Sequence, residues 1–123
     1  MSEVFKESMI AKKTYAFALL VIKMTKLLYK NYENVILIKQ IIRSVTSIGA
    51  NIEEALGANS RKEFIHSMNI AKKEARETLY WLKLLLEINP DVSANIRVLL
   101  KENQEIVNIL TKIVKTSSSN ANL

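Results

Sequence analysis

The chain has 123 residues, no cysteine, two glycines and one proline, and its formal net charge at neutral pH is +6. One domain is expected at this length, and the lack of cysteine excludes disulfides, thiolate nucleophiles and cysteine-based metal sites. The scarcity of glycine and proline favours helices, because sheet proteins need more turn residues. The positive charge favours an anionic partner, nucleic acid before an acidic membrane surface, although solubility alone accounts for such a charge in many small proteins.

The longest apolar run, Tyr15 to Ile22, has eight residues, whereas a membrane-spanning helix needs roughly 20. Lys12 and Lys13 precede this run as in a secretory signal, but no small-residue cleavage site follows it and the helical periodicity continues. We therefore expect a cytoplasmic protein with no membrane partner.

The first predicted helix begins at Ser2 or Glu7 and ends near Tyr29. From Tyr15 to Ile22 it is apolar on every side, whereas a helix on the outside of a monomeric bundle needs only one apolar stripe. A second buried face against another subunit would explain this composition, so we expect the protein to oligomerise.

Asn34 is the predicted N-cap of a second helix that runs from Val35 to about Ala55. A strand over residues 35–42 is the alternative, because β-branched residues dominate there. The helix is favoured because apolar residues recur at alternating spacings of three and four along it: Ile38, Ile41, Val45, Ile48 and Ile52.

The third predicted helix covers Arg61 to about Ile88, with Ser60 as its N-cap and Glu63 completing a capping box. Asn89 and Pro90 end this helix, since proline cannot continue the hydrogen-bond ladder.

A fourth helix is predicted to follow, capped by Asp91 or Ser93. Its apolar rhythm continues to Ile113, and the Ser/Asn-rich residues 117–123 are expected to form a disordered tail. Four long helices with short turns predict an all-α, antiparallel up-down-up-down four-helix bundle over residues 1–116.

The single histidine, His66, is the first candidate for chemistry. It follows Glu63 at the Glu-x-x-His spacing of di-metal bundles, but such a site needs a second motif, and therefore a second histidine. No metal or other cofactor is therefore expected. His66 also follows Arg61 at the spacing of the HEPN ribonucleases, in which the histidine acts in acid–base chemistry and the arginine steadies phosphate charge. A metal-independent ribonuclease is thus the alternative to a non-enzymatic protein.

Basic residues gather on one side of the third predicted helix, with Tyr80 among them: Lys72, Lys73, Arg76 and Lys83. They are candidate contacts to nucleic acid, since such a stripe would bind phosphates and the tyrosine would stack on a base. A solvated face is the plain alternative, with neighbouring glutamates diluting the charge. A second lysine stripe lies on the first predicted helix: Lys12, Lys23, Lys26 and Lys30.

Two stretches of the sequence are distinctive. Residues 43–55 read RSVTSIGANIEEA, and residues 64–85 read FIHSMNIAKKEARETLYWLKLL. They resemble the four-helix-bundle family first noticed as open reading frames in 23S rRNA intervening sequences, sometimes labelled ribosomal-protein-like. The resemblance is strong over the second and third predicted helices, whereas the first and fourth match only in length and pattern.

The resemblance places the signature polar residues of the family on Ser47, Asn51, Glu54 and Glu77, and Arg43 lies four residues before Ser47 on the same side. We expect these five residues to form a polar face with a network between the second and third helices or across a subunit contact. Many relatives have Pro where this chain has Gly49, Gly where it has Ala55, and Gly-Ser where it has Lys73 and Glu74. The residues of this chain look like those of one branch of the family.

The resemblance also implies a homopentamer with its bundles arranged in a barrel around a channel. Relatives include the accessory variability determinant of diversity-generating retroelements, which is basic, pentameric, and associates with a reverse transcriptase and nucleic acid. The expected partners are therefore further copies of the chain, RNA or DNA, and a reverse transcriptase or other protein. The expected function is a non-enzymatic oligomeric module, and an adaptor between proteins with no nucleic-acid role stays open as another alternative.

Overall fold

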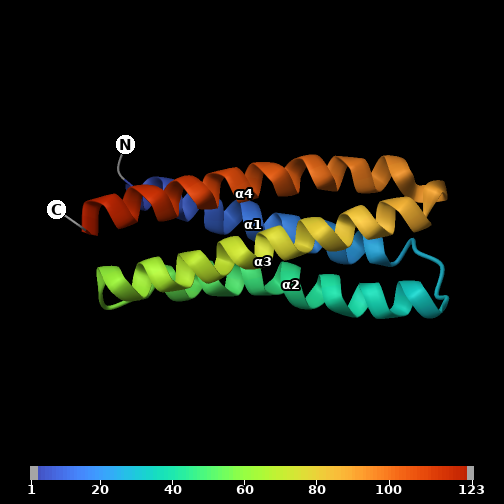
Figure 1. Cartoon of the computed structure of the whole chain (residues 1–123), viewed down its shortest axis with the longest axis horizontal. Coiled ribbons are helices and arrows are strands. Elements are labelled where there is room, and N and C mark those ends of the chain that lie inside the picture. Colours follow the sequence, from blue (N-terminus) through green and yellow to red (C-terminus); the bar gives the residue numbers. More distant parts are fainter. Residues whose placement is uncertain (1–2, 122–123) are drawn as a thin grey trace.

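The computed structural model describes residues 3–121, with the side chains of residues 9–119. Each helix runs opposite to the one before it, and the chain returns to the end at which it started (Figure 1). The elements are α1 (Glu3–Thr25), α2 (Tyr32–Leu56), α3 (Arg61–Ile88), the short 3-10 helix η1 (Pro90–Val92) and α4 (Ser93–Ala121). The prediction of an all-α four-helix bundle is confirmed.

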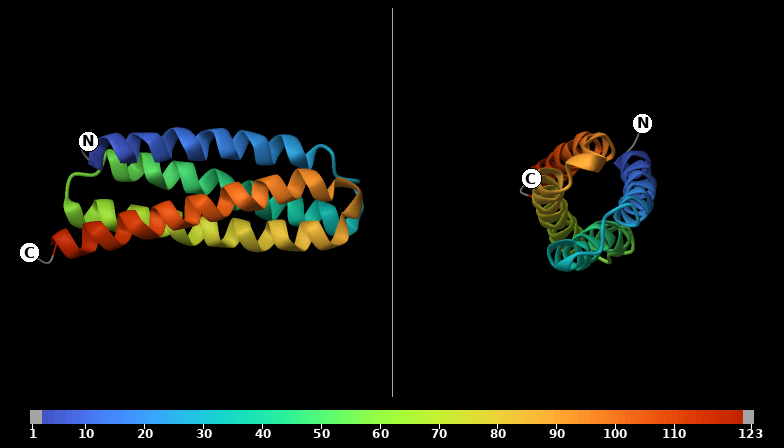
Figure 2. Two further views of the ribbon diagram at one scale, coloured as in Figure 1. Left: turned by 90° about the horizontal axis from the view of Figure 1, so that it is seen from above. Right: turned by 90° about the vertical axis from the view of Figure 1, so that its right-hand side faces the viewer.

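The four helices surround one core, and each packs against two others, as the end-on view in Figure 2 shows. The α3 helix packs extensively against both α2 and α4. The α1 helix packs less extensively against the same two neighbours. The bundle therefore has one tightly packed half around α3 and one looser half around α1.

The apolar stripe of α2 forms the centre of the core. Ile41, Val45, Ile48 and Ile52 are all fully buried, as their spacing predicts. By length and composition alone, α2 would also be long and apolar enough to cross a membrane. The buried stripe accounts for part of that composition, since 28% of the apolar window is buried, whereas Val35 and Ile36 of the same helix are exposed.

The start of α2 differs from the prediction. The helix begins at Tyr32, and Asn31 is its N-cap, because the Asn31 side chain accepts a hydrogen bond from the Asn34 backbone N–H at 2.9 Å. Asn34 is instead buried inside the first turn, where its amide bonds to other groups. Both asparagines fit a cap by residue type, so only the position of the turn decides between them.

The predicted cap of α3 is present, whereas α1 is shorter than predicted. Ser60 caps α3 by accepting from the Glu63 N–H at 3.1 Å, and the Glu63 carboxylate accepts in return from the Asn59 N–H at 3.0 Å. The second bond of this capping box thus lies one residue earlier than usual.

The α1 helix ends at Thr25, not Tyr29, and the Lys30 ammonium donates to the Thr25 carbonyl at 2.7 Å.

The predicted disordered tail over 117–123 also differs from the structure. The α4 helix continues to Ala121, and Ser117 is buried. Ser117 lies seven residues after the buried Leu110, so it stays on the core side of the helix, and packing outweighs the weak helix propensity of the serines. Residues 122–123 lie outside the described residues.

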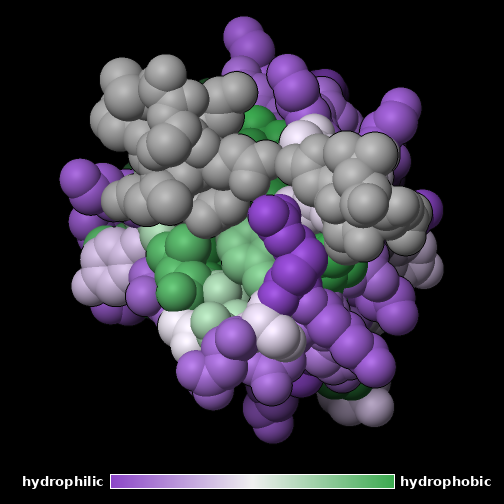
Figure 3. Space-filling view, turned by 90° about the vertical axis from the view of Figure 1, so that its left-hand side faces the viewer, coloured by the Kyte–Doolittle hydropathy of each residue, from purple (hydrophilic) through white to green (hydrophobic). Residues whose placement is uncertain are grey.

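Figure 3 views the end of the bundle that carries the α2–α3 turn and both termini. Apolar atoms gather at the middle of this end, and polar side chains surround them (Figure 3). Leu56, the last residue of α2, is 39% exposed. The described part of this end therefore leaves apolar surface in contact with solvent.

Candidate nucleic-acid interface and polar clusters

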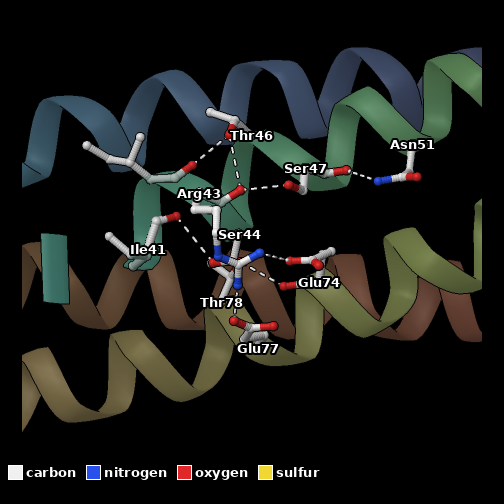
Figure 4. A network of polar contacts seen from close by, with 10 residues as sticks. Ile41, Arg43, Ser44, Thr46, Ser47, Asn51, Glu74, Glu77 and Thr78 are labelled. Atoms are coloured by element: carbon white, nitrogen blue, oxygen red, sulfur yellow. Dashed lines mark hydrogen bonds and ion pairs between the residues drawn. The ribbon is translucent and has the colours of Figure 1, made fainter. Parts of the chain in front are cut away.

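An ion-pair cluster joins α2 to α3 (Figure 4). The Arg43 guanidinium on α2 donates to the Glu77 carboxylate and, at 3.4 Å, to the Glu74 carboxylate, both on α3. The structure therefore brings together Arg43 and Glu77 of the predicted polar face. Glu74 was not predicted as part of this polar face. Its spacing of three residues from Glu77 places both glutamates on one side of the helix and is the sequence signal that points to it.

The remaining residues of the predicted polar face do not bridge the two helices. The Ser47 hydroxyl donates to the Arg43 carbonyl at 2.8 Å, and the Asn51 amide donates to the Ser47 carbonyl at 2.8 Å, both within α2. Glu54 is exposed and makes no hydrogen bond to the described residues. The expected network between α2 and α3 thus rests on Arg43 and the two glutamates.

A second polar link between α2 and α3 lies in the core. Ser44 and Thr78 are fully buried, and the Thr78 hydroxyl hydrogen-bonds the Ser44 hydroxyl at 2.8 Å. Both side chains also bond to carbonyls of their own helices, Ile41 for Ser44 and Glu74 for Thr78. This pair was not predicted, because Thr78 lies in the apolar register of α3 and an isolated hydroxyl there does not reveal its partner.

A third buried polar residue, Asn103, links α4 to α3. Its Nδ2 donates to the Ala75 carbonyl at 2.9 Å, whereas its Oδ1 is buried with no partner among the described residues. A buried polar residue at a core position favours one register of neighbouring helices. Asn103 therefore helps to fix the level of α4 relative to α3.

One lysine connects α1 to α4. The Lys13 ammonium lies 2.7 Å from a Glu102 carboxylate oxygen and 3.2 Å from a Glu105 oxygen. The hydrogen bond to Glu102 is the main cause that raises the pKa of Lys13 above its ordinary value of 10.5. Burial, the next largest effect, lowers this pKa, and the smaller effect of the Glu105 hydrogen bond raises it. Both acidic side chains of α4 thus form ion pairs with α1.

The predicted basic residues of α3 are available to a partner. Lys73, Arg76 and Lys83 are exposed and Lys72 is partly exposed, and none forms an ion pair with a described side chain. Of the glutamates in the alternative, Glu74 and Glu77 bind Arg43 on the side of α3 next to α2, whereas Glu87 is exposed four residues after Lys83. Tyr80 is 56% exposed and makes an edge-to-face contact with Trp81.

Four further basic residues, which were not predicted as contacts, lie on α4: Arg97, Lys101, Lys112 and Lys115. All four are exposed and form no ion pair with a described side chain. They are scattered singly along the sequence, and the two glutamates among them would be expected to offset their charge. Only the structure shows that those glutamates bind Lys13 instead.

The candidate residues for catalysis do not form a site within one chain. His66 is exposed, forms no hydrogen bond with the described residues, and lies about 140° around α3 from Arg61. Glu63 is used in the helix cap. Among the described residues, no three of the side chains that commonly bind metals come together as a cluster.

The surface of α1 exposes large apolar side chains. Tyr15 is 69% exposed and Leu20 50%, and Leu27, two residues after the end of the helix, is 55% exposed. Phe17 and Val21, by contrast, are buried in the core. The apolar composition of α1 therefore exceeds what the core of one chain covers.

Comparison with known proteins gives the family. The model for the 23S rRNA-intervening sequence protein matches residues 6–112. A crystal structure of a protein of unknown function from the S23 ribosomal protein family of Bacteroides thetaiotaomicron VPI-5482 shares 39% sequence identity. The alignment covers 89% of this chain and 98% of that one, with a TM-score of 0.81. No curated protein matches the sequence. This chain belongs to the family of 23S rRNA-intervening sequence proteins.

Proposed function

We propose that the protein is a non-enzymatic, homo-oligomeric helical-bundle module that binds RNA or DNA. The observation that carries this proposal is the set of exposed basic side chains on α3 that form no ion pair within the described chain. Lys72, Arg76 and Lys83 recur at spacings of four and seven, so they form one stripe along the helix. Cations held in such a row would bind consecutive phosphates of a nucleic acid and release the counterions that those phosphates hold.

The oligomeric part of the proposal rests on α1. Its exposed apolar side chains and its weaker packing within the bundle favour burial against another copy of the chain. The family resemblance points to five copies. In a ring, the basic stripe of each subunit would repeat around the axis, and the fields of the stripes would add. Such an assembly would also suit a scaffold for a nucleic-acid-processing partner such as a reverse transcriptase.

The test is the affinity for a fluorescently labelled structured RNA at low salt, measured by anisotropy. In the test variant, Lys72→Gln, Arg76→Gln and Lys83→Gln remove three charges from α3. In the matched control, Lys23→Gln, Lys26→Gln and Lys39→Gln remove three exposed charges from α1, from the residue after its end and from α2. We expect the α3 variant to lose about tenfold or more in affinity and the control to lose much less.

Three results bear on the proposal in different ways. If the wild-type protein binds no RNA or DNA at low salt, direct binding is wrong. If both variants weaken binding equally, net charge and not the α3 stripe is responsible. If the RNA is cleaved without added metal and His66→Ala stops the cleavage, the protein is a ribonuclease and the non-enzymatic proposal fails.

A further inference from the structure

The α3 and α4 helices lie side by side and antiparallel (Figure 1). The hydrogen bond from Asn103 to the Ala75 carbonyl fixes their relative level. Counting along both helices from this bond gives the basic residues that share a level: Lys83 with Arg97, and Arg76 with Lys101. Two basic residues of each helix are therefore matched in height to within about 3 Å, whereas Lys112 and Lys115 lie beyond Lys72, toward the start of α3.

The basic stripe of α3 lies on the side toward α4. The two glutamates that Arg43 binds mark the side of α3 next to α2. Lys72, Arg76 and Lys83 lie about a third to half a turn around the helix from those glutamates. The stripe is thus directed away from the ion pairs and toward the neighbouring basic helix.

The outer side of α4 is mainly positive, with the exposed Glu105 at its edge toward α1. Its basic residues fall within about a sixth of a turn of one another: Arg97, Lys101, Lys112 and Lys115. The two acidic residues of α4, Glu102 and Glu105, both bind Lys13 of α1. From Arg97 to Lys115 the row extends about 27 Å along the helix axis.

The two rows together form what we call the α3–α4 basic face: Lys72, Arg76 and Lys83 of α3 with Arg97, Lys101, Lys112 and Lys115 of α4. Two exposed acids, Glu87 and Asp91, lie at its end, next to the η1 connection. Packed helices are about 8–10 Å apart, so the face presents two nearly parallel rows of cations at that separation.

The α3–α4 basic face lacks the several aromatic side chains that binding of a single-stranded nucleic acid requires. Proteins that bind single strands stack successive bases on several aromatic side chains. The α4 helix has no aromatic residue, and Tyr80 is the one aromatic side chain of α3 that is mostly exposed. One tyrosine at the edge of the face would hold one base at most. The face is therefore built for phosphates and not for bases.

We infer that the α3–α4 basic face binds the phosphate backbone of a nucleic-acid double helix without reading its sequence. This inference rests on the proposed nucleic-acid function and deepens it. A duplex carries one charge per about 1.7 Å of its axis, so about 16 phosphates lie within 27 Å. Among the described residues, no helix or loop projects outward from α3 and α4 (Figure 2), so none would enter a groove of the duplex, and the contacts would position the duplex without specifying bases. RNA helices in particular are recognised by backbone and shape.

The test compares a 20-base-pair RNA duplex, the matching DNA duplex and one of the RNA strands made free of secondary structure. Affinity is measured by anisotropy over a range of salt concentrations, with anionic lipid vesicles as a further arm. We expect both duplexes to bind at least tenfold more tightly than the single strand. A preference for RNA over DNA would assign recognition to the 2′-hydroxyls or the A-form shape.

The variant that tests the face carries Arg97→Gln, Lys101→Gln, Lys112→Gln and Lys115→Gln. Its control removes four exposed charges elsewhere, through Lys12→Gln, Lys23→Gln, Lys26→Gln and Lys39→Gln. We expect the slope of log affinity against log salt to become shallower by about 0.9 for each phosphate that the variant no longer neutralises. The control should keep the wild-type slope, and circular dichroism should show both variants fully helical.

The outcomes separate this inference from the proposed function. If the single strand binds as tightly as the duplexes, or if the α4 variant keeps the wild-type slope, the inference is wrong while nucleic-acid binding stands. If the wild-type protein binds none of the three nucleic acids, the proposed function fails as well. If it binds vesicles and no nucleic acid, the face belongs to a membrane surface.

Discussion

Asn34 on α2 and Asn89 after α3 form a reciprocal pair of amides. Asn34 Nδ2 donates to Asn89 Oδ1 at 2.8 Å, and Asn89 Nδ2 donates to Asn34 Oδ1 at 2.9 Å. The second proton of each Nδ2 also has a partner, since Asn34 donates to the Tyr29 carbonyl and Asn89 to the Leu85 carbonyl. The pair therefore ties the α1–α2 connection to the end of α3 in a buried position.

Replacing Asn34 by alanine should destabilise the bundle markedly. Asn89 would be left with a buried oxygen that lacks its partner, and an unsatisfied buried polar group costs about 1–3 kcal/mol. The free energy of unfolding in urea measures the loss. The control is Asn108→Ala, which removes an exposed amide that accepts from Gln104 within α4 and should change stability by less than about 0.5 kcal/mol. Equal effects of the two substitutions would contradict the structural role of the pair.

The Arg43 ion pairs should contribute a modest amount. Arg43→Gln removes the bonds to both Glu74 and Glu77, and partly exposed ion pairs of this kind contribute about 1 kcal/mol or less. A double-mutant cycle with Glu77→Gln, followed by thermal unfolding, isolates the pairwise part. A coupling energy of zero would mean that the polar face of α2 serves a purpose other than holding α3.

The buried hydroxyl pair gives a sharper test, because its two halves should not be additive. Thr78→Val alone removes one of the two partners of the Ser44 hydroxyl inside the core and should cost about 0.5–1.5 kcal/mol. Adding Ser44→Ala to the same chain should cost little more, since the bond between the two hydroxyls is already lost and Ser44 keeps only its bond to the Ile41 carbonyl of its own helix. Urea unfolding of the two single variants and the double variant gives the three free energies. Strict additivity would show that the hydroxyls act independently.

Lys13 gives stability a dependence on alkaline pH. Its pKa is raised above 10.5 in the folded chain by the hydrogen bond to Glu102, so the folded state holds this proton more tightly than the unfolded state. The resulting stabilisation is fully present below pH 10.5 and is lost as the pH rises through the folded pKa. Lys13→Met should therefore lower stability by about 0.5–1 kcal/mol at neutral pH, and the difference from wild type should shrink above pH 10.5.

The control for Lys13 is Lys12→Met, which removes an exposed neighbour that forms no ion pair with the described residues. It should leave the wild-type dependence on pH unchanged. If Lys13→Met behaves in the same way as Lys12→Met at every pH, the link between α1 and α4 does not stabilise the bundle.

Much of the fold follows from the spacing of apolar residues. The recurrence of isoleucine along α2 and the break at Asn89–Pro90 each predict a feature that the structure contains. The end of α4 could not be predicted in this way, because serine disfavours helices in isolation and only packing of Ser117 into the core reverses that preference.

The candidate interface was predicted in part. The α3 stripe is apparent from the spacing of its lysines and arginine, but the contribution of α4 depends on which charges are neutralised by other helices. By their spacing in the sequence, Glu102 and Glu105 would offset the basic residues of α4, whereas in the structure they bind Lys13 on α1. The pairing of charged side chains between helices depends on the tertiary structure, so the sequence of one helix alone does not predict it.

The mass of the protein in solution tests the central claim most directly. Light scattering after size exclusion is run with and without a structured RNA at low salt, and on a Leu20→Lys, Leu27→Lys variant that places charge on the exposed apolar surface of α1 and of the turn that follows it. We expect a mass that is a multiple of 14.0 kDa, five copies in the pentamer that the family resemblance implies, and a further increase with RNA. The α1 variant should dissociate. A wild-type chain that stays at 14.0 kDa and does not respond to RNA would contradict the proposed oligomeric nucleic-acid module.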